Sequence, residues 1–218
     1  MKKLLLMSAI AMGALTTTKA QDFKKPLKET FEVFDTTRDQ EKKMQLGNKL
    51  GLIAKKWPNE WATHYYYSLA KVGLSYQEKD EAKHDALLDE ADKERDEAVA
   101  ILGKENDETY VLASMIANSR MMINPMQRWQ KYGKIFQDNL KNAQEANPEN
   151  PRMYYFKGVT TMFTPKNFGG GKKNALPYFE KAEGLFAKEK NDDIMKPYWG
   201  KFQNTFFIAE CKKEDKDN

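Results

Sequence analysis

The apolar residues that follow Asp22 recur at intervals of three and four, and strict alternation of apolar and polar positions is almost absent. This period is typical of amphipathic helices and predicts an all-α chain. Proline and glycine mark the breaks, at Pro58, Pro125, the segment 148–151 and the glycine run 169–171. The predicted helices span about residues 22–34, 38–56, 59–76, 81–102, 107–122, 125–146, 151–163, 172–188 and 194–211.

One spacing recurs within these helices. A first residue is followed four positions later by a bulky one, which is Arg95 in one copy, and three positions after that by an apolar residue or alanine. A helix breaker comes five positions further on. The four copies are Leu46-Leu50-Ile53-Pro58, Ala91-Arg95-Ala98-Gly103, Phe136-Leu140-Ala143-Pro148 and Ala175-Phe179-Ala182-Ala187, the last without the breaker. This spacing places three side chains on one stripe of a helix, so we expect each stripe to pack against a neighbouring helix.

The pattern resembles the second helix of the tetratricopeptide repeat (TPR) family. Partial first-helix patterns precede it, as Tyr66-Leu69-Ala70-Gly73, Tyr110-Ala113-Ser114-Ala117 and Tyr154-Lys157-Gly158-Thr161. The resemblance covers most of residues 40–210 and implies an α-solenoid of antiparallel helix pairs, with 21–211 as a single domain. The copies begin 45, 45 and 39 residues apart, whereas TPR units repeat at about 34 residues. A HEAT-like or other α–α superhelix is therefore the alternative.

The N-terminus has the pattern of a secretory signal peptide. Lys2 and Lys3 precede an apolar run from Leu4 to Leu15, and the polar exit ends at Ala20. We expect cleavage there and export, to the periplasm in a two-membrane bacterium. No cysteine lies at the end of the run, where a lipid would be attached, which predicts a soluble protein rather than a lipoprotein. The charged segment 212–218 is expected to be a disordered tail.

The net charge and the cysteine content narrow the range of functions and stabilising bonds open to the protein. Removal of residues 1–20 takes away three lysines and no acid, so the formal charge falls from +4 to +1. Nearly neutral chains with interspersed signs are poor candidates for nucleic-acid binding. Cys211 is the only cysteine, so no internal disulfide is possible, and its apolar surroundings predict a buried, inert thiol.

The run Phe168-Gly-Gly-Gly-Lys-Lys173 contains the residue types of a phosphate-binding loop. It lacks the Walker spacing and a preceding strand, so we interpret it as a turn between two helices, with an anion site beside its lysines as the alternative. The following helix is expected to start near Asn174, a good N-cap that also leaves Pro177 within the first turn.

Candidate catalytic and metal-ligating residues are sparse. His64 and His84 have no histidine or cysteine at ligand spacing, and the acid-rich helix around His84 is interpreted as a solvated, salt-bridged face. No residue pattern places a base beside a nucleophile. We therefore expect a protein that is not an enzyme and has no metal and no cofactor.

The resemblance also implies a concave groove formed by the first helices. Its residues, carried over from the family's positions, are His64, Tyr67, Lys71, Leu74, Glu108, Val111, Met115, Asn118, Arg152, Tyr155, Val159 and Met162. Arg120 and Arg128 are hypothesised to hold an acidic group at one end of this groove. The groove would be apolar and aromatic, which suits an extended peptide or an amphipathic helix.

Two functions follow from these observations. The first is a scaffold or adaptor that binds a protein or peptide in its groove. The alternative is a carrier of a small apolar ligand, because the resemblance extends to periplasmic TPR subunits associated with solute transport. The sequence determines neither the partner nor the oligomeric state.

Overall fold

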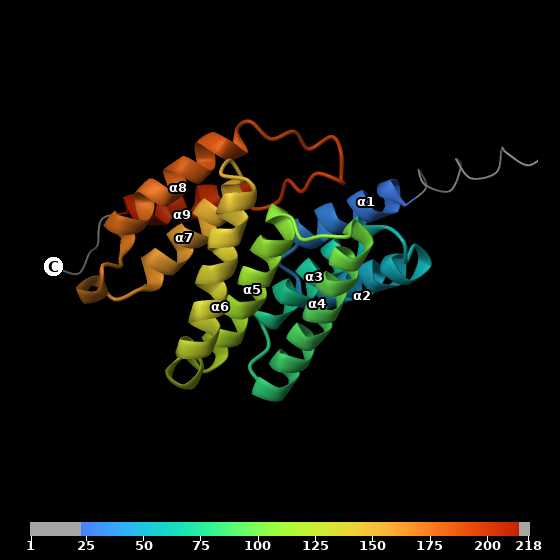
Figure 1. Ribbon diagram of the computed structural model, residues 1–218, viewed down its shortest axis with the longest axis horizontal. Helices are drawn as coiled ribbons and strands as arrows, with labels where there is room; N and C mark the ends of the chain where they lie inside the picture. Colours follow the sequence, from blue (N-terminus) through green and yellow to red (C-terminus); the bar gives the residue numbers. More distant parts are fainter. Residues whose placement is uncertain (1–22, 214–218) are drawn as a thin grey trace, which may run out of the picture.

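A computed structural model describes residues 23–213, and within this range it contains nine α-helices, one short 3-10 helix and no strand (Figure 1). The all-α class and the helical-repeat architecture are thus confirmed. The predicted signal peptide and residues 214–218 of the predicted tail lie outside the described residues. The helices are α1 (Lys24–Thr36), α2 (Gln40–Lys56), α3 (Trp61–Ser75), α4 (Glu81–Leu102), α5 (Asp107–Ile123), α6 (Pro125–Ala146), α7 (Pro151–Phe163), η1 (Lys166–Phe168), α8 (Lys172–Phe186) and α9 (Lys201–Lys212).

Consecutive helices pack as neighbours, most extensively α3 with α4, α5 with α6 and α7 with α8, and together they form a curved row (Figure 1). The recurring stripe found in the sequence lies on the buried face of the even-numbered helices. Its buried members are Leu50, Ile53, Ala91, Ala98, Phe136, Leu140, Ala143, Ala175, Phe179 and Ala182. Burial of this stripe removes apolar surface of each even helix from water, which stabilises the packing of neighbouring helices.

Small residues let these helices approach closely. A Cβ atom on Gly158 of α7 would lie 2.6 Å from Cε1 of Phe179 on α8. Glycine therefore makes room for the Phe179 ring, which is fully buried. This pairing of a small residue with a large one explains why the two positions have these residue types in the sequence.

The last helix differs from the prediction, because α9 begins at Lys201 and not near residue 194. Residues 187–200, which we call the strap, run from α8 back to α1 and return to α9 (Figure 1). Lys24 Nζ lies 3.0 Å from Asp193 Oδ1, and the Tyr198 hydroxyl donates to Glu32 at 3.0 Å. Ile194 and Trp199 of the strap are buried. The apolar residues of this segment therefore resemble those of a helix in the sequence, although the segment is not helical.

The glycine run forms the turn that its composition predicts. Gly169 and Gly171 have φ values of +80° and +97°, a region that favours glycine. A Cβ atom on Gly170 would lie 1.9 Å from the Thr164 carbonyl oxygen. The next helix, α8, begins at Lys172, where the predicted range 172–188 also begins, but Asn174 is not its N-cap. The Asn174 side chain instead donates to the carbonyl oxygens of Gly169 and Gly170 at 3.1 and 3.2 Å. Pro177 consequently lies inside α8.

Candidate functional site

A largely apolar cavity of about 350 Å³ lies between the odd-numbered helices. We call it the apolar cavity. Its walls come from α1, α3, α5, α7 and α9, with one residue from α2 and two from the strap. The lining residues are Phe31, Phe34, Asp35, Lys43, Leu69, Gly73, Tyr76, Gln77, Met115, Asn118, Met122, Tyr155, Phe156, Val159, Phe163, Trp199, Gly200, Gln203 and Phe207. Concave, aromatic-rich cavities with few polar groups are typical small-molecule sites.

The charged side chains of this lining lie at the α1–α2 side. Lys43 is its one cation and Asp35 its one carboxylate. Lys43 Nζ lies 5.0 Å from the centre of the Phe34 ring, and Gln203 Nε2 donates to Asp35 Oδ1 at 3.2 Å. Burial raises the pKa of Asp35, an effect that Gln203 and Lys43 oppose, and burial lowers the pKa of Lys43.

Two tyrosines supply hydroxyl groups to the same cavity. Desolvation raises the pKa of Tyr76 to about 12 although the residue as a whole is 39% exposed, and a hydrogen bond with Asn118 opposes this shift. Burial also raises the pKa of Tyr155, with further contributions from nearby Tyr76 and Asp35. Both phenols are therefore neutral at physiological pH. They offer hydrogen bonds and aromatic faces to a ligand, without charge.

Trp199 forms a fixed wall of the cavity. Its Nε1 donates to the Tyr65 hydroxyl at 2.8 Å, and its ring meets that of Phe156 edge-on at 6.2 Å between centroids. The guanidinium of Arg152 lies 5.2 Å from the Trp199 ring centre. Because Trp199 belongs to the strap, the contacts that hold the strap also shape the cavity.

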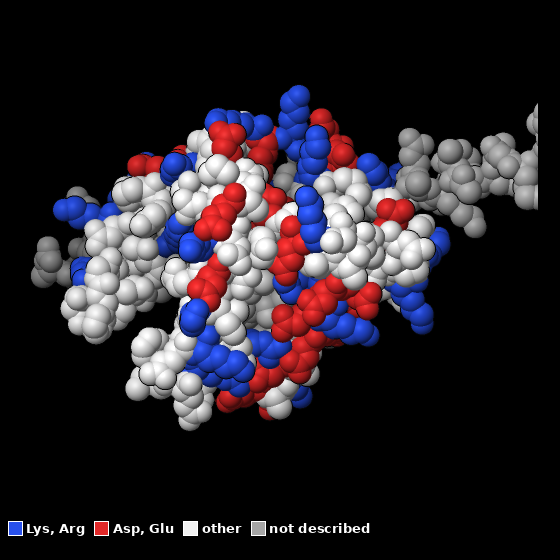
Figure 2. Space-filling model, viewed as in Figure 1, with Lys and Arg blue, Asp and Glu red and all other residues white. Residues whose placement is uncertain are grey.

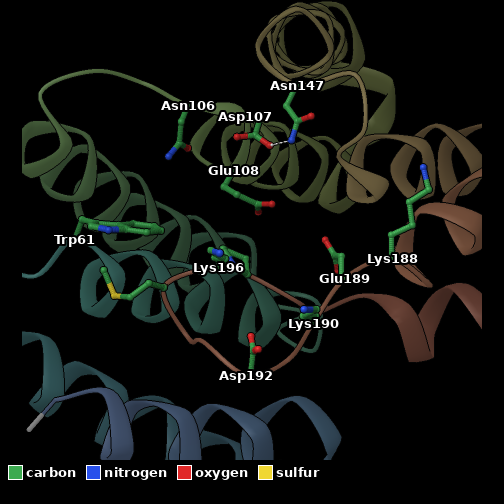
Figure 3. Close-up of a pocket in the computed structure, with 12 residues that line it drawn as sticks. Trp61, Asn106, Asp107, Glu108, Asn147, Lys188, Glu189, Lys190, Asp192 and Lys196 are labelled. Carbon is green, nitrogen blue, oxygen red and sulfur yellow. Dashed lines mark hydrogen bonds between the residues drawn. The ribbon is translucent and has the colours of Figure 1, made fainter. Parts of the chain in front are cut away.

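A second cavity, of about 650 Å³, has a polar lining (Figure 3). Glu108 and Glu189 point into the same space from α5 and from the strap. Each is already paired with Arg152, at 3.1 and 2.7 Å, and Glu108 also accepts from Tyr65 and Asn150, both at 2.8 Å. Burial raises the pKa of Glu108 to about 7. These carboxylates are thus occupied in holding the strap to α5 and α7.

Four of the predicted groove residues lie together in the apolar cavity. Met115 and Asn118 come from α5, and Tyr155 and Val159 come from α7. Met115 and Asn118 are each 6% exposed. The positions implied by the TPR resemblance are therefore brought together on these two helices, although their role in binding stays a prediction.

The α3 residues predicted for the groove lie elsewhere. His64 Nδ1 lies 2.6 Å from Glu94, Lys71 Nζ lies 2.7 Å from Glu90, and Tyr67 donates to Glu90 as well. These partners are on α4, so this set faces the neighbouring helix. The cavity instead takes Leu69, Gly73, Tyr76 and Gln77 from this part of the chain.

The remaining predicted positions are also outside the cavity. Leu74 lines a separate hollow between α2, α3 and α4, Val111 is fully buried, and Met162 packs in the cluster of α8 and α9. Glu108 and Arg152 form the buried ion pair described above. The register implied by the resemblance thus holds for the middle of α5 and α7 but not along whole helices.

The two arginines proposed for the groove end are paired within the chain. Arg120 lies 2.7 and 2.9 Å from Asp89 and Asp92, and Arg128 lies 2.6 Å from both Asp85 and Glu81. All four carboxylates belong to α4. The arginines therefore hold α4 against α5 and α6.

The remaining candidate residues are His84 and Cys211. His84, predicted on a solvated face, is only 3% exposed, and its Nε2 lies 3.1 Å from the Ser119 hydroxyl; that interpretation of its surroundings was wrong. Cys211 is partly buried, which raises the pKa of its thiol. Residues 23–213 contain no cluster of three or more histidine, cysteine or acidic side chains arranged to hold a metal.

Sequence reasoning missed the contributions of the first two helices and the last. Phe31, Phe34 and Asp35 come from α1, Lys43 comes from α2, and Gln203 and Phe207 come from α9. The amphipathic pattern of residues 22–34 indicates a buried face there, but no repeat pattern says that this face borders a cavity.

The surface charge agrees with the near-neutral composition. Acidic and basic side chains are interspersed over the face in Figure 2, with acidic groups gathered near α4. Within the described part of the chain, no helix is both long and apolar enough to cross a membrane.

Comparison with known proteins gives a likeness to a solved structure. No family model matches the chain, and no curated protein does. Among solved structures, the chain is similar to the HusA haemophore from Porphyromonas gingivalis, with 29% sequence identity and a TM-score of 0.75. The match covers 95% of this chain and 98% of that one. The likeness therefore extends over the whole fold, including the helices that enclose the apolar cavity.

Proposed function

We propose that this protein is an exported, non-catalytic carrier that binds a flat, largely apolar ligand of the haem class in the apolar cavity. The observation that carries the proposal is the cavity itself, an aromatic-lined space in a chain that is similar along its length to a haemophore. The signal-peptide pattern of residues 1–20 supports export.

The chemistry of the lining fits a tetrapyrrole. The rings of Phe31, Phe156 and Trp199 offer apolar surface to a porphyrin face. Tyrosine and methionine are among the side chains that ligate haem iron, and the cavity contains Tyr76, Tyr155 and Met115. Its volume of about 350 Å³ is at the small end of the range of roughly 300–1,000 Å³ for ligand sites, so one edge of a large ligand would stay in solvent.

This proposal follows the carrier alternative rather than the protein-binding adaptor that the sequence favoured. Four predicted groove residues lie in a cavity with a ligand-sized volume, while seven of the other eight are occupied in internal pairs or in packing. The likeness to a haemophore also favours a small ligand over a peptide. We keep the resemblance to the TPR family as a proposal about the helical architecture alone.

The test is a titration of the protein purified without residues 1–20 with haem, followed by the haem Soret band and by tryptophan emission. We expect a saturable one-site change and quenching of Trp199, which lines the cavity. Val159→Trp would fill the cavity and abolish both changes. Val33→Trp, on the exposed face of α1 outside the cavity, is the matched control and should bind as the unmodified protein does.

Two results would overturn the proposal. A protein whose Soret band and emission do not change with haem is not a carrier of this class. If Val159→Trp folds normally by circular dichroism and binds haem as tightly as Val33→Trp, the ligand occupies another site.

A further inference from the structure

The polar end of the apolar cavity combines one amine and one carboxyl group in an otherwise uncharged lining. Lys43 lies against the face of Phe34 and near Asp35, and among residues 23–213 it forms no ion pair. Asp35 is held by Gln203 from α9. Lys43 thus lines an aromatic cavity with Asp35 as the nearby charge that favours its protonated form, and no ion pair fixes its ammonium group.

Such an ammonium has a clear ligand preference. A cation beside low-dielectric walls attracts an anionic group more strongly than one in open water does. A hydrogen bond from an ammonium to a carboxylate is also stronger than one between neutral groups. A ligand with an apolar body and a carboxylate at its edge would therefore place that carboxylate at the α1–α2 side of the cavity.

Asp35 acts in the opposite direction. A second carboxylate at the same end repels an anionic ligand group while Asp35 is ionised. Burial disfavours that ionised form, because it raises the pKa of Asp35. Gln203 stabilises it by donating to Oδ1 at 3.2 Å. The charge at this end is consequently set by two residues whose effects on an anionic ligand have opposite signs.

We propose that Lys43 is a specificity-determining residue that holds a carboxylate of the bound ligand, and that Asp35 limits the affinity for ligands with this group. This inference rests on the proposed carrier function and names the part of the ligand that the cavity selects. It gives the protein a preference for carboxylate-bearing ligands over esterified or neutral ones of the same shape.

The experiment compares protoporphyrin IX with its dimethyl ester, which keeps the ring and removes the negative charges. Dissociation constants are measured by fluorescence titration for the unmodified protein, Lys43→Gln and Asp35→Asn. Lys49→Gln is the control, because Lys49 is an exposed lysine on the same helix and does not line the cavity. Circular dichroism verifies that each variant is folded.

For the free acid, we expect Lys43→Gln to weaken binding roughly tenfold, the size of one lost hydrogen bond to a charged group. Asp35→Asn should tighten binding of the acid by about twofold or more. Neither change should alter binding of the ester, and Lys49→Gln should leave both ligands unaffected.

The outcomes separate this inference from the proposed function. If the unmodified protein binds acid and ester equally and Lys43→Gln changes neither, the selectivity is refuted while the carrier function stands. If neither porphyrin binds and haem does not bind either, the carrier function itself has failed. A loss of affinity for acid and ester alike in Lys43→Gln would also refute the inference, because it would indicate a packing effect.

Discussion

Removing the positive charge of Arg152 should destabilise the protein strongly, and the cost should depend on pH. Arg152 is 1% exposed, and its guanidinium lies 3.1 Å from Glu108 and 2.7 Å from Glu189. The guanidinium also donates a hydrogen bond to the carbonyl oxygen of Pro197 in the strap. Arg152→Met keeps much of the side-chain volume but leaves two carboxylates without their counter-charge.

The expected cost at pH 7 is about 3–5 kcal/mol in the free energy of unfolding, the range found when one partner of a buried ion pair is removed. Lys134→Met is the matched control. Lys134 pairs with Asp138 one helical turn away, and both side chains are more than half exposed, so its cost should stay below about 0.5 kcal/mol. Urea unfolding monitored by circular dichroism measures both values.

The pH dependence follows from Glu108. Its pKa in the folded protein is about 7, raised from 4.5 mainly by burial. The folded state therefore holds this proton to higher pH than the unfolded state does. Its contribution to stability is fully present below about pH 4.5 and is lost as the pH rises through 7. Without Arg152 the pKa of Glu108 should rise further, so the cost of Arg152→Met should be smaller at pH 5 than at pH 7.

A double variant isolates the interaction. Arg152→Met combined with Glu108→Gln should cost less than the sum of the two single changes, since the second removes a charge that the first leaves unpaired. A cost for Arg152→Met below about 1 kcal/mol at pH 7, or one equal at pH 5 and pH 7, would refute the argument that this buried pair holds the strap.

Two further changes test the turn and the one strongly paired histidine. Gly170→Ala should lower the free energy of unfolding by roughly 1–3 kcal/mol, because its Cβ atom would lie 1.9 Å from the Thr164 carbonyl oxygen; Gly184→Ala, where nothing lies within 4 Å, is the control, and equal melting temperatures would contradict the turn geometry. The hydrogen bond with Glu94 raises the pKa of His64, so its stabilisation is fully present below the unfolded pKa of about 6.5 and is lost as the pH rises through the higher folded value. The unmodified protein should therefore lose stability as the pH rises above about 6.5, whereas His64→Gln should not. Parallel pH profiles of the free energy of unfolding for the two proteins would disprove this role of His64.

The predicted groove was right where local pattern and tertiary position coincide. On α5 and α7 the positions implied by the resemblance include Met115 and Tyr155, and both line the cavity. On α3 it fails, because that helix is buried on most of its surface and the predicted residues turn toward carboxylates of α4. Spacing along one helix specifies a face, but not which partner that face meets.

The strap illustrates the same limit. Ile194 and Tyr198 lie four positions apart, a spacing compatible with a helix, and Ile194 and Trp199 are buried. Gly200, with φ of +100°, ends the strap immediately before α9. Lys24 contacts Asp193 of the strap and Arg152 contacts Pro197, across 169 and 45 positions of the sequence. No local pattern records such contacts.

The sequence by itself determined the all-helical class, most of the helix boundaries and the buried stripe of each even helix. These features depend on the period of apolar residues, on caps and on helix breakers, which act over a few positions. Only the tertiary structure decided that α1, α2, the strap and α9 close the row of helices into a cavity, and that Lys43 and Asp35 meet at one end of it. The reason is physical: a cavity is the space left between elements distant in the chain, and its lining depends on how their faces meet.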